Sequence, residues 1–190
     1  MTLRNEAALD FLRTRRSRPA KTLTKPAPSR DQLIEILEAG TRVPDHGKLE
    51  PWRLKVLEKP TLEKIAGAAK KYCESINCEE AVTAKALKQF EDGELGVLVI
   101  EVQKPSEKIP EIEQTYFCWA LCALALLMLD LQQVGVQTGS LVGYPMTEIF
   151  IKTFGLDTNE RVAGIIYFGT ETVTPAERPR PNLAEIVTWE

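Results

Sequence analysis

An unbroken run of apolar side chains, FCWALCALALLML at residues 117–129, constrains the fold of this chain more than any other feature. The run ends at Asp130, well short of the roughly 18–20 residues that a helix needs to cross a bilayer. A helix that is apolar on nearly every side must instead be surrounded by protein. We expect a long helix over residues 110–134, in the centre of the fold, at a subunit interface, or both. The run therefore favours an oligomer.

The charge balance excludes several classes of partner and site. The 190 residues include 24 Lys and Arg against 27 Asp and Glu, a net charge of -3. This length predicts a single domain over residues 1–190. A nucleic-acid-binding protein would normally carry a clear basic excess, so no nucleic-acid partner is expected. His46 is the one histidine, so a multi-histidine metal site within the chain is excluded, and we expect no metal.

The four cysteines do not have the spacing of a disulfide framework or a zinc site. Four residues separate Cys73 from Cys78 and three separate Cys118 from Cys122, so neither pair forms a CxxC motif. The second pair lies one helical turn apart and is expected to be buried in the long helix. No apolar segment of a signal peptide follows the first charges. We expect reduced thiols, a cytoplasmic location and no membrane partner.

Hydrophobic periodicity predicts helices interspersed with strands. Helices are expected over residues 4–14, 29–40, 61–91 with an interruption around 75–78, 110–134 and 146–154. Strands are expected over residues 52–58, 96–102 and 161–170, with a glycine-punctuated strand or loop over 135–145. Three or more strands among helices predict an α+β or mixed α/β domain.

A basic run, RTRRSR at residues 13–18, directly follows the first predicted helix. Closely spaced guanidinium groups around a serine hydroxyl suit a phosphate, because arginine offers forked donors and serine adds a short hydrogen bond. A charged run of this kind is also common on a solvated face. Residue types alone leave both interpretations open.

Two further segments could carry chemistry. In the loop TRVPDHGKLEPW, residues 41–52, His46 could be a base, a hydrogen-bond donor to a ligand, or an ordinary surface residue. The turns QTGS at residues 137–140 and Gly169-Thr170 could let a ligand approach the backbone, or they could be simple turns. Neither is a dinucleotide-binding or Walker motif, and no serine or cysteine has the partners of a hydrolytic triad.

Four segments in order resemble the nitroreductase family of flavoproteins, and in particular its short bacterial members. They are RRS at 15–17, TRVPDHGKLEPW at 41–52, GVQTGSLVG at 135–143 and FGLDTNERVAGIIYFGT at 154–170. The resemblance extends from about residue 9 to the RPRP tail. It implies an α+β fold with a central, mostly antiparallel sheet flanked by helices. It also implies an obligate homodimer with the long helix at the interface and the tail, about residues 177–190, packing on the partner subunit.

The same resemblance implies bound FMN and assigns residues to it. The matching positions are Arg15, Arg16, Ser17, Arg42, His46, Gln137, Thr138, Gly139, Gly169, Thr170, Arg178 and Arg180. Residues 15–17 would hold the phosphate and ribityl chain, with the Gly169-Thr170 turn and the tail arginines nearby. The loop 41–52 would reach the flavin from the neighbouring subunit, and residues 137–139 would lie along the isoalloxazine ring.

The implied activity is that of an FMN-dependent NAD(P)H oxidoreductase. NADH or NADPH would deliver hydride to flavin N5, and a nitroaromatic, quinone or similar small-molecule acceptor would then be reduced in ping-pong order. The flavin carries this chemistry, so no catalytic side chain is expected. Many family members have asparagine at the position of His46, and a bulkier residue near Gln137, so the acceptor is the least constrained part of this assignment.

Two alternatives stand beside this activity. One is a flavin-binding protein without significant turnover, acting as a carrier or sensor. The other is an anion-binding or nucleic-acid-binding module that uses the arginine run, and the net negative charge counts against it.

Overall fold

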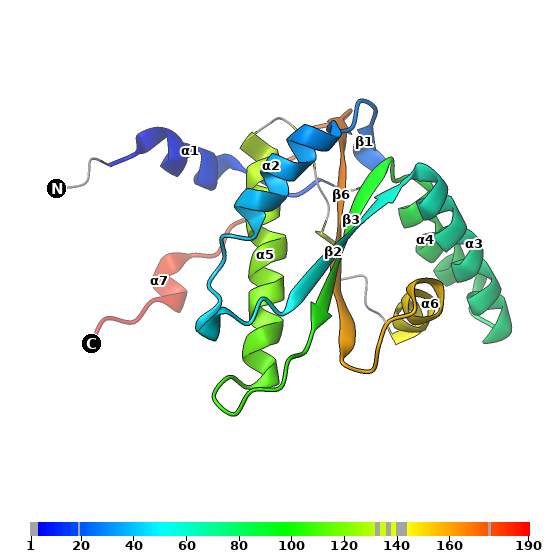
Figure 1. Cartoon of the computed structure of the whole chain (residues 1–190). Coiled ribbons are helices and arrows are strands. Elements are labelled where there is room, and N and C mark those ends of the chain that lie inside the picture. Colours follow the sequence, from blue (N-terminus) through cyan, green and yellow to red (C-terminus); the bar gives the residue numbers. More distant parts are fainter. Residues whose placement is uncertain (1–3, 19, 132–133, 136–137, 140–143, 175) are drawn as a thin grey trace.

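An antiparallel sheet runs through the middle of the computed structural model (Figure 1). The structure describes residues 4–18, 20–131, 134–135, 138–139, 144–174 and 176–190, and the side chains of residues 126–148 lie outside this description. Within the described residues the strands are β1 (Leu23–Thr24), β2 (Trp52–Glu58), β3 (Leu95–Val102), β4 (Val134–Gly135), β5 (Thr138–Gly139) and β6 (Glu160–Glu171). Their order is β1-β6-β3-β2, with β4 and β5 also paired to β6, and each of these pairings is antiparallel.

Helices cover both faces of this sheet. They are α1 (Glu6–Thr14), α2 (Arg30–Gly40), α3 (Lys59–Ser75), α4 (Glu80–Glu91), α5 (Glu111–Leu131), α6 (Tyr144–Phe154) and α7 (Leu183–Ile186), with short 3-10 helices at Ala20–Thr22 and His46–Lys48. α2 and α5 lie on one face, and α3, α4 and α6 lie on the other (Figure 1). α1 and the tail with α7 extend away from this body on the side of α2 and α5 (Figure 1). The predicted α+β fold with a mostly antiparallel sheet flanked by helices is confirmed.

Alternation along the central strands sets the two cores. Val97 and Val99 of β3 belong to the core beneath α2 and α5, whereas Leu98 and Ile100 belong to the core beneath α3 and α6. All four side chains are fully buried. Removing a side chain of this kind from water stabilises a fold by about 1.5–3 kcal/mol. Because β3 is buried on both faces, its sequence is a continuous apolar run and is easily recognised as a strand.

Up to Ala125, where its side chains are described, the long helix α5 is covered on one side only. Its inner side chains Cys118, Leu121 and Cys122 are buried, as predicted for the two cysteines. On the opposite side Tyr116 and Trp119 are 63% and 59% exposed. A single chain therefore leaves part of this apolar helix uncovered. Among the helices in the described part of the chain, none has the length and apolarity to cross a membrane.

Helix ends and short strands account for the differences from the predicted elements. α2 begins after Ser29, whose side chain and that of Gln32 form a capping box that is visible in the sequence. α3 and α4 are separated near Cys78, where the sequence predicts an interruption. β1, the two 3-10 helices and α7 were not predicted, because elements of two to four residues show no periodicity.

Candidate cofactor site

The basic run that follows α1 lies at the carboxyl end of β6. The Arg15 guanidinium donates to Ser17 Oγ at 3.2 Å. The Arg18 guanidinium forms an ion pair with Glu171 of β6. It also donates to the Arg16 carbonyl oxygen at 2.7 Å. These three arginines are half-buried, so this part of the run folds onto the sheet and is not simply a solvated face.

Gly169 and Thr170 lie between two short strands at this end of the sheet. Thr170 pairs with Thr24 of β1 and with Val134 of β4. A Cβ added to Gly169 would lie 2.8 Å from the Thr24 carbonyl oxygen, so the close approach of β1 requires glycine here. Thr170 Oγ1 donates to the Pro26 carbonyl oxygen at 2.8 Å. Both predicted site residues therefore hold the end of the sheet together.

The C-terminal tail returns to the same place. Arg16 donates to a carbonyl oxygen of the tail. Arg180 lies 3.4 Å from the Arg15 carbonyl oxygen and 2.9 Å from the Glu177 carboxylate. The Arg178 N–H, followed by the neighbouring guanidinium charges, lowers the pKa of Glu177. The side chain of Arg180 thus contacts the residues of the basic run, whereas Arg178 contacts Glu177 through its backbone N–H.

These contacts define a group that we name the arginine cluster. Its members are Arg15, Arg16, Arg18, Arg180, Glu171 and Glu177. Four guanidinium groups against two carboxylates leave two positive charges in excess. A phosphate monoester carries about -1.5 to -2 at neutral pH. The excess charge and the forked donors of the cluster therefore fit the phosphate of the expected cofactor.

Two short strands between α5 and α6, β4 and β5, pair with β6, and β4 lies at the end near this cluster. Gly135 pairs with Gly169, and Thr138 and Gly139 pair with β6 nearer its middle. Gln137 lies outside the described residues. The backbone of Thr138 and Gly139, in the predicted ring-contacting segment, therefore lies along β6. Gly169 and Thr170 belong to β6 itself, so the turn predicted for them is wrong.

The loop that carries Arg42 and His46 lies at the other end of the sheet. His46 Nδ1 is 3.1 Å from Glu113 Oε1, near the start of α5. The Asp45 carboxylate accepts two backbone N–H groups of the same loop at 3.0 and 2.9 Å. Arg42 is exposed. Asp45 thus holds the shape of this loop, while His46 ties the loop to α5.

The predicted site residues form two groups that are far apart within one chain. α5 begins beside Arg161, whose guanidinium is 3.2 Å from Glu111. Arg161 lies near the start of β6 and Thr170 near its end. About nine residues of extended strand between them correspond to roughly 30 Å. This span exceeds the length of a flavin mononucleotide, so one chain does not bring His46 and the arginine cluster to the same cofactor.

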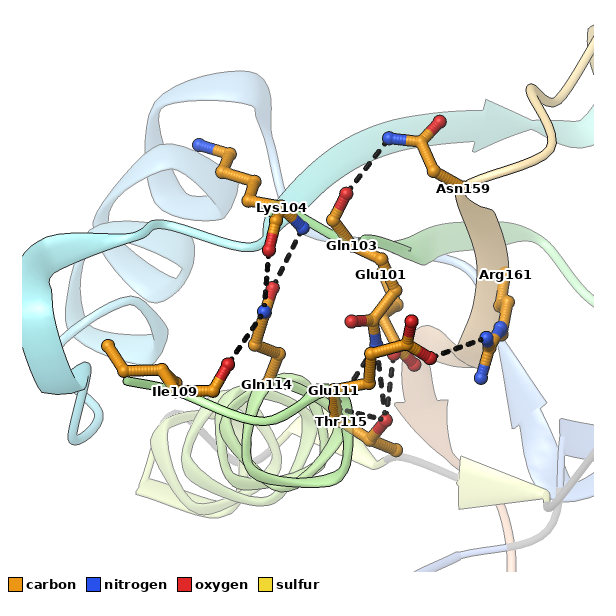
Figure 2. A network of polar contacts seen from close by, with 9 residues as sticks. All are labelled: Glu101, Gln103, Lys104, Ile109, Glu111, Gln114, Thr115, Asn159 and Arg161. Atoms are coloured by element: carbon orange, nitrogen blue, oxygen red, sulfur yellow. Dashed lines mark hydrogen bonds and ion pairs between the residues drawn. The ribbon is translucent and has the colours of Figure 1, made fainter. Parts of the chain in front are cut away.

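A buried polar network fastens α5 to the His46 end of the sheet (Figure 2). Glu101 of β3 is only 3% exposed. Its carboxylate accepts from Thr115 Oγ1 at 2.7 Å and from the Gln103 side chain. Gln114 bonds the backbone N–H and C=O of Lys104 at 2.9 and 2.8 Å. Sequence reasoning missed this network. Its signal is a carboxylate in the apolar strand GVLVIEV, because a buried carboxylate needs partners.

The two cysteines of α5 do not offer a reactive thiolate. The Cys118 thiol donates to the Pro51 carbonyl oxygen at 3.1 Å. Burial, aided by the nearby Glu101 carboxylate, raises the pKa of Cys118 to about 12. Burial also raises the pKa of Cys122 to about 12. Within the described ranges, no group of three or more His, Cys, Asp or Glu side chains is placed to hold a metal ion.

Known proteins match this chain over most of its length. The sequence model of the Nitroreductase family matches residues 12–170. A Haemophilus influenzae protein provisionally named an NAD(P)H nitroreductase is 32% identical over 165 residues, which cover 86% of this chain and 88% of that protein.

Solved structures share the fold described above. A nitroreductase-like family protein from Bacillus cereus superimposes with a TM-score of 0.80 at 23% identity, covering 100% of this chain and 98% of that chain. A protein from Desulfovibrio desulfuricans, provisionally named a nitroreductase and solved in complex with FMN, has a TM-score of 0.76 at 20% identity, covering 99% and 98%. On the match of the sequence model and on this shared fold, the chain belongs to the nitroreductase family.

Proposed function

We propose that this chain is an FMN-dependent NAD(P)H oxidoreductase that acts, as a homodimer, on a nitroaromatic, quinone or similar small-molecule acceptor. The arginine cluster is the observation that carries this proposal, because its excess positive charge lies beside glycine-bearing strands at one end of β6. Family membership and the FMN-bound relative support the choice of ligand. Bound FMN would supply two-electron transfer between NADH or NADPH and the acceptor, in ping-pong order.

The residues of this chain bind and orient the cofactor. Arg15 and Arg16 donate to the phosphate, and Ser17 adds a hydroxyl donor. The tail arginines, Arg178 and Arg180, close the site from the outside. The backbone of residues 137–139 would lie along the ring, and Gly139 would keep the approach open, since glycine has no side chain to block a ligand. We assign no side chain a catalytic role.

The distance between the two groups of residues supports a homodimer. Since His46 lies roughly 30 Å from the carboxyl end of β6, its loop serves the cofactor held by the partner's arginine cluster. The outer side of α5, with the exposed Trp119, offers apolar surface for a partner to cover. The tail, about residues 177–190, ends near the exposed Trp189 and packs on the same partner. We take residues 1–190 as one domain and place it in the cytoplasm, because its four cysteines are free thiols.

Cofactor binding is tested with Arg16→Ala. Loss of hydrogen bonds to a charged phosphate costs about 1.5–3 kcal/mol, so the Kd for FMN should rise about 10- to 100-fold. Arg13→Ala is the matched control, because it removes the same charge from an exposed residue in the last turn of α1. Equal losses in both variants would contradict the assignment. A protein that takes up no added FMN would overturn the proposal itself.

Turnover is tested by adding NADPH and then NADH to the FMN-loaded protein without oxygen. Bleaching of the flavin absorption, with recovery on addition of a nitroaromatic or quinone, is the expected result. Absorption that persists with both donors would instead favour the flavin-binding protein without turnover.

Whether each site uses residues of two chains is tested with a heterodimer of two different variants. Chains with Arg16→Ala and chains with Arg42→Ala/His46→Ala are purified as a heterodimer with two different tags. One of its two sites then carries every lesion and the other carries none, so about half of the wild-type turnover should return. Turnover equal to the mean of the two parent homodimers would show that each site draws on a single chain.

A further inference from the structure

α3 ends in a turn that brings two cysteines together. The last helical residue is Ser75, and Asn77 adopts a left-handed conformation with φ of 52°. The Cys78 N–H donates to the Cys73 carbonyl oxygen at 2.9 Å, and the Asn77 N–H donates to the Glu74 carbonyl oxygen at 3.2 Å. Together these bonds form a Schellman motif that begins at Cys73 and ends at Cys78.

Side chains at the first and last positions of this motif often contact each other across the turn. Here both are free thiols, with Cys73 buried and Cys78 half-buried. Burial, followed by the neighbouring Cys73 thiol, raises the pKa of Cys78. A disulfide needs its two Cα atoms within roughly 4.4–6.8 Å of each other. The backbone hydrogen bond between the same two residues holds them in close approach.

The second cysteine pair provides a contrast within the same chain. Cys118 and Cys122 lie one turn apart in α5, where neighbouring Cβ atoms on one helix face are about 5–6 Å apart. A disulfide requires a Cβ separation of about 3.5–4.5 Å. The Cys118 thiol is also held by the Pro51 carbonyl oxygen. Although closer in sequence, this pair cannot close without distorting the helix.

We propose that Cys73 and Cys78 are a redox-modifiable pair that closes to an intramolecular disulfide on meeting a small disulfide such as oxidised glutathione. The half-buried Cys78, as its thiolate, attacks one glutathione sulfur, and the first glutathione thiolate leaves. Cys73, as its thiolate, then attacks the Cys78 sulfur of the mixed disulfide, and the second glutathione thiolate leaves. The two cysteines are oxidised, the glutathione disulfide is reduced to two thiols, and those thiols take up the two cysteine protons.

This pair stands apart from the proposed cofactor site. α3 and α4 cover the face of the sheet opposite α5 (Figure 1). None of the contacts that build the arginine cluster or the His46 loop includes Cys73 or Cys78. Closure therefore does not depend on bound FMN, and its test is independent of the oxidoreductase activity.

The experiment equilibrates the purified full chain in graded mixtures of reduced and oxidised glutathione, then quenches with acid. Remaining thiols are alkylated under denaturing conditions and mapped by peptide mass spectrometry. We expect Cys73 and Cys78 to be joined, with loss of two hydrogens (about 2 Da), while Cys118 and Cys122 stay alkylated at every ratio. The folded chain should reach half-closure at an oxidised-to-reduced ratio about tenfold lower than the chain in urea, because folding pre-arranges the turn.

Variants of the turn separate its geometry from simple proximity in sequence. Asn77→Gly keeps the left-handed conformation and should retain the tenfold advantage. Asn77→Val places a β-branched residue at positive φ and should lose most of it. Cys78→Ser should show no closure at any ratio. The inference is overturned if both cysteines stay alkylated in the folded wild type, if folded and urea-unfolded chains close equally, or if the two Asn77 variants behave alike.

Discussion

The two ends of β6 differ in how their charges are balanced. At the carboxyl end, the arginine cluster has more guanidinium groups than carboxylates. At the other end, which we call the matched end, two arginines are each paired with a carboxylate: Arg53 with Glu160 at 2.8 Å, and Arg161 with Glu111 at 3.2 Å. The first end therefore attracts an anion, whereas the two arginine pairs at the second end leave no such excess of positive charge.

This difference assigns anion binding to one end of β6 and stabilisation of the fold to the other. At the matched end, the buried Glu101 and its partner Thr115 hold α5 and the adjoining loop in place. Changes there should lower the free energy of unfolding and leave FMN affinity unchanged. At the arginine end, charge changes should lower FMN affinity and leave the fold intact. Gly169 is the exception, because it is a steric requirement of the sheet itself.

Gly169→Val should have the largest effect on stability. Its new Cβ would meet the Thr24 carbonyl oxygen at 2.8 Å, and this backbone atom cannot move aside alone. Overpacking of this kind costs about 1–3 kcal/mol, so we expect a loss near 3 kcal/mol in the free energy of unfolding, with most bound FMN lost. Urea unfolding and the flavin content per chain measure both.

Gly164→Ala is the control for this prediction, because it lies in the same strand and its new Cβ would lie 3.7 Å from Cys122 Sγ, an ordinary contact. Its free energy of unfolding should change by less than about 1 kcal/mol. If Gly169→Val proved as stable as Gly164→Ala, β1 would be able to shift, and the arginine end would not hold its residues in a fixed arrangement.

Thr115→Val tests the matched end and should have the next largest effect. The substitution preserves shape but removes the hydroxyl that donates to the buried Glu101 carboxylate at 2.7 Å. Leaving a buried acceptor without this donor costs about 1–3 kcal/mol in the free energy of unfolding. The Kd for FMN, measured by fluorescence titration, should not change. Thr83→Val in α4 removes a hydroxyl that bonds only a helix carbonyl group, so its cost should be smaller. A matching loss of FMN affinity in Thr115→Val would break the separation of the two ends.

Arg53→Gln should make the free energy of unfolding depend less steeply on pH under acidic conditions. Arg53 contacts both carboxylate oxygens of Glu160, and this hydrogen bonding lowers the pKa of Glu160 below its ordinary value. A carboxyl group with a lowered folded-state pKa adds stability above its unfolded pKa, and that stability is lost as the pH falls through the folded pKa. The variant should lose about 1 kcal/mol at pH 7. The difference from wild type should shrink once the pH falls below the ordinary glutamate pKa of about 4.3, and vanish below the lowered pKa of Glu160 in the folded state.

Urea unfolding at a series of pH values measures this convergence. Arg161→Gln is the comparison variant, because Arg161 and its partner Glu111 are both largely exposed and contribute less. Curves for Arg53→Gln and wild type that stay parallel down to pH 3 would show that the Glu160 carboxyl is not the source of the difference.

Periodicity in the sequence predicts the large elements and not the small ones. β2, β3 and β6 were predicted within one residue at each end, because long apolar runs identify buried strands. β1 was missed, although its two residues, Leu23 and Thr24, define the arginine end of the sheet by pairing with Glu171 and Thr170. A two-residue strand exists only through its partner, so no local pattern reveals it.

The candidate site divides in the same way. Residue types and the family resemblance predict the arginines and His46 as site residues, and these assignments stay predictions. They do not reveal that His46 and the arginine cluster lie at opposite ends of β6, because the direction and register of an antiparallel strand depend on contacts far apart in sequence. The partners of Glu101 were missed for the same reason, since Thr115 approaches it from the next helix.

His46→Asn should have the smallest effect on the free energy of unfolding. It therefore tests whether the two ends of β6 have separate roles. The His46 side chain is 67% exposed, and exposed ion pairs contribute about 0–1 kcal/mol. Asparagine can still donate to Glu113, so the free energy of unfolding should change by less than about 0.5 kcal/mol. FMN content should also stay constant. The KM for the acceptor should change, because the His46 loop reaches the cofactor that the partner subunit holds. Glu113→Gln, which alters the same contact from α5, should match it in stability without a shift in KM. Loss of FMN from His46→Asn comparable to that from Arg16→Ala would place His46 in phosphate binding, and the two ends of β6 would then act as one site.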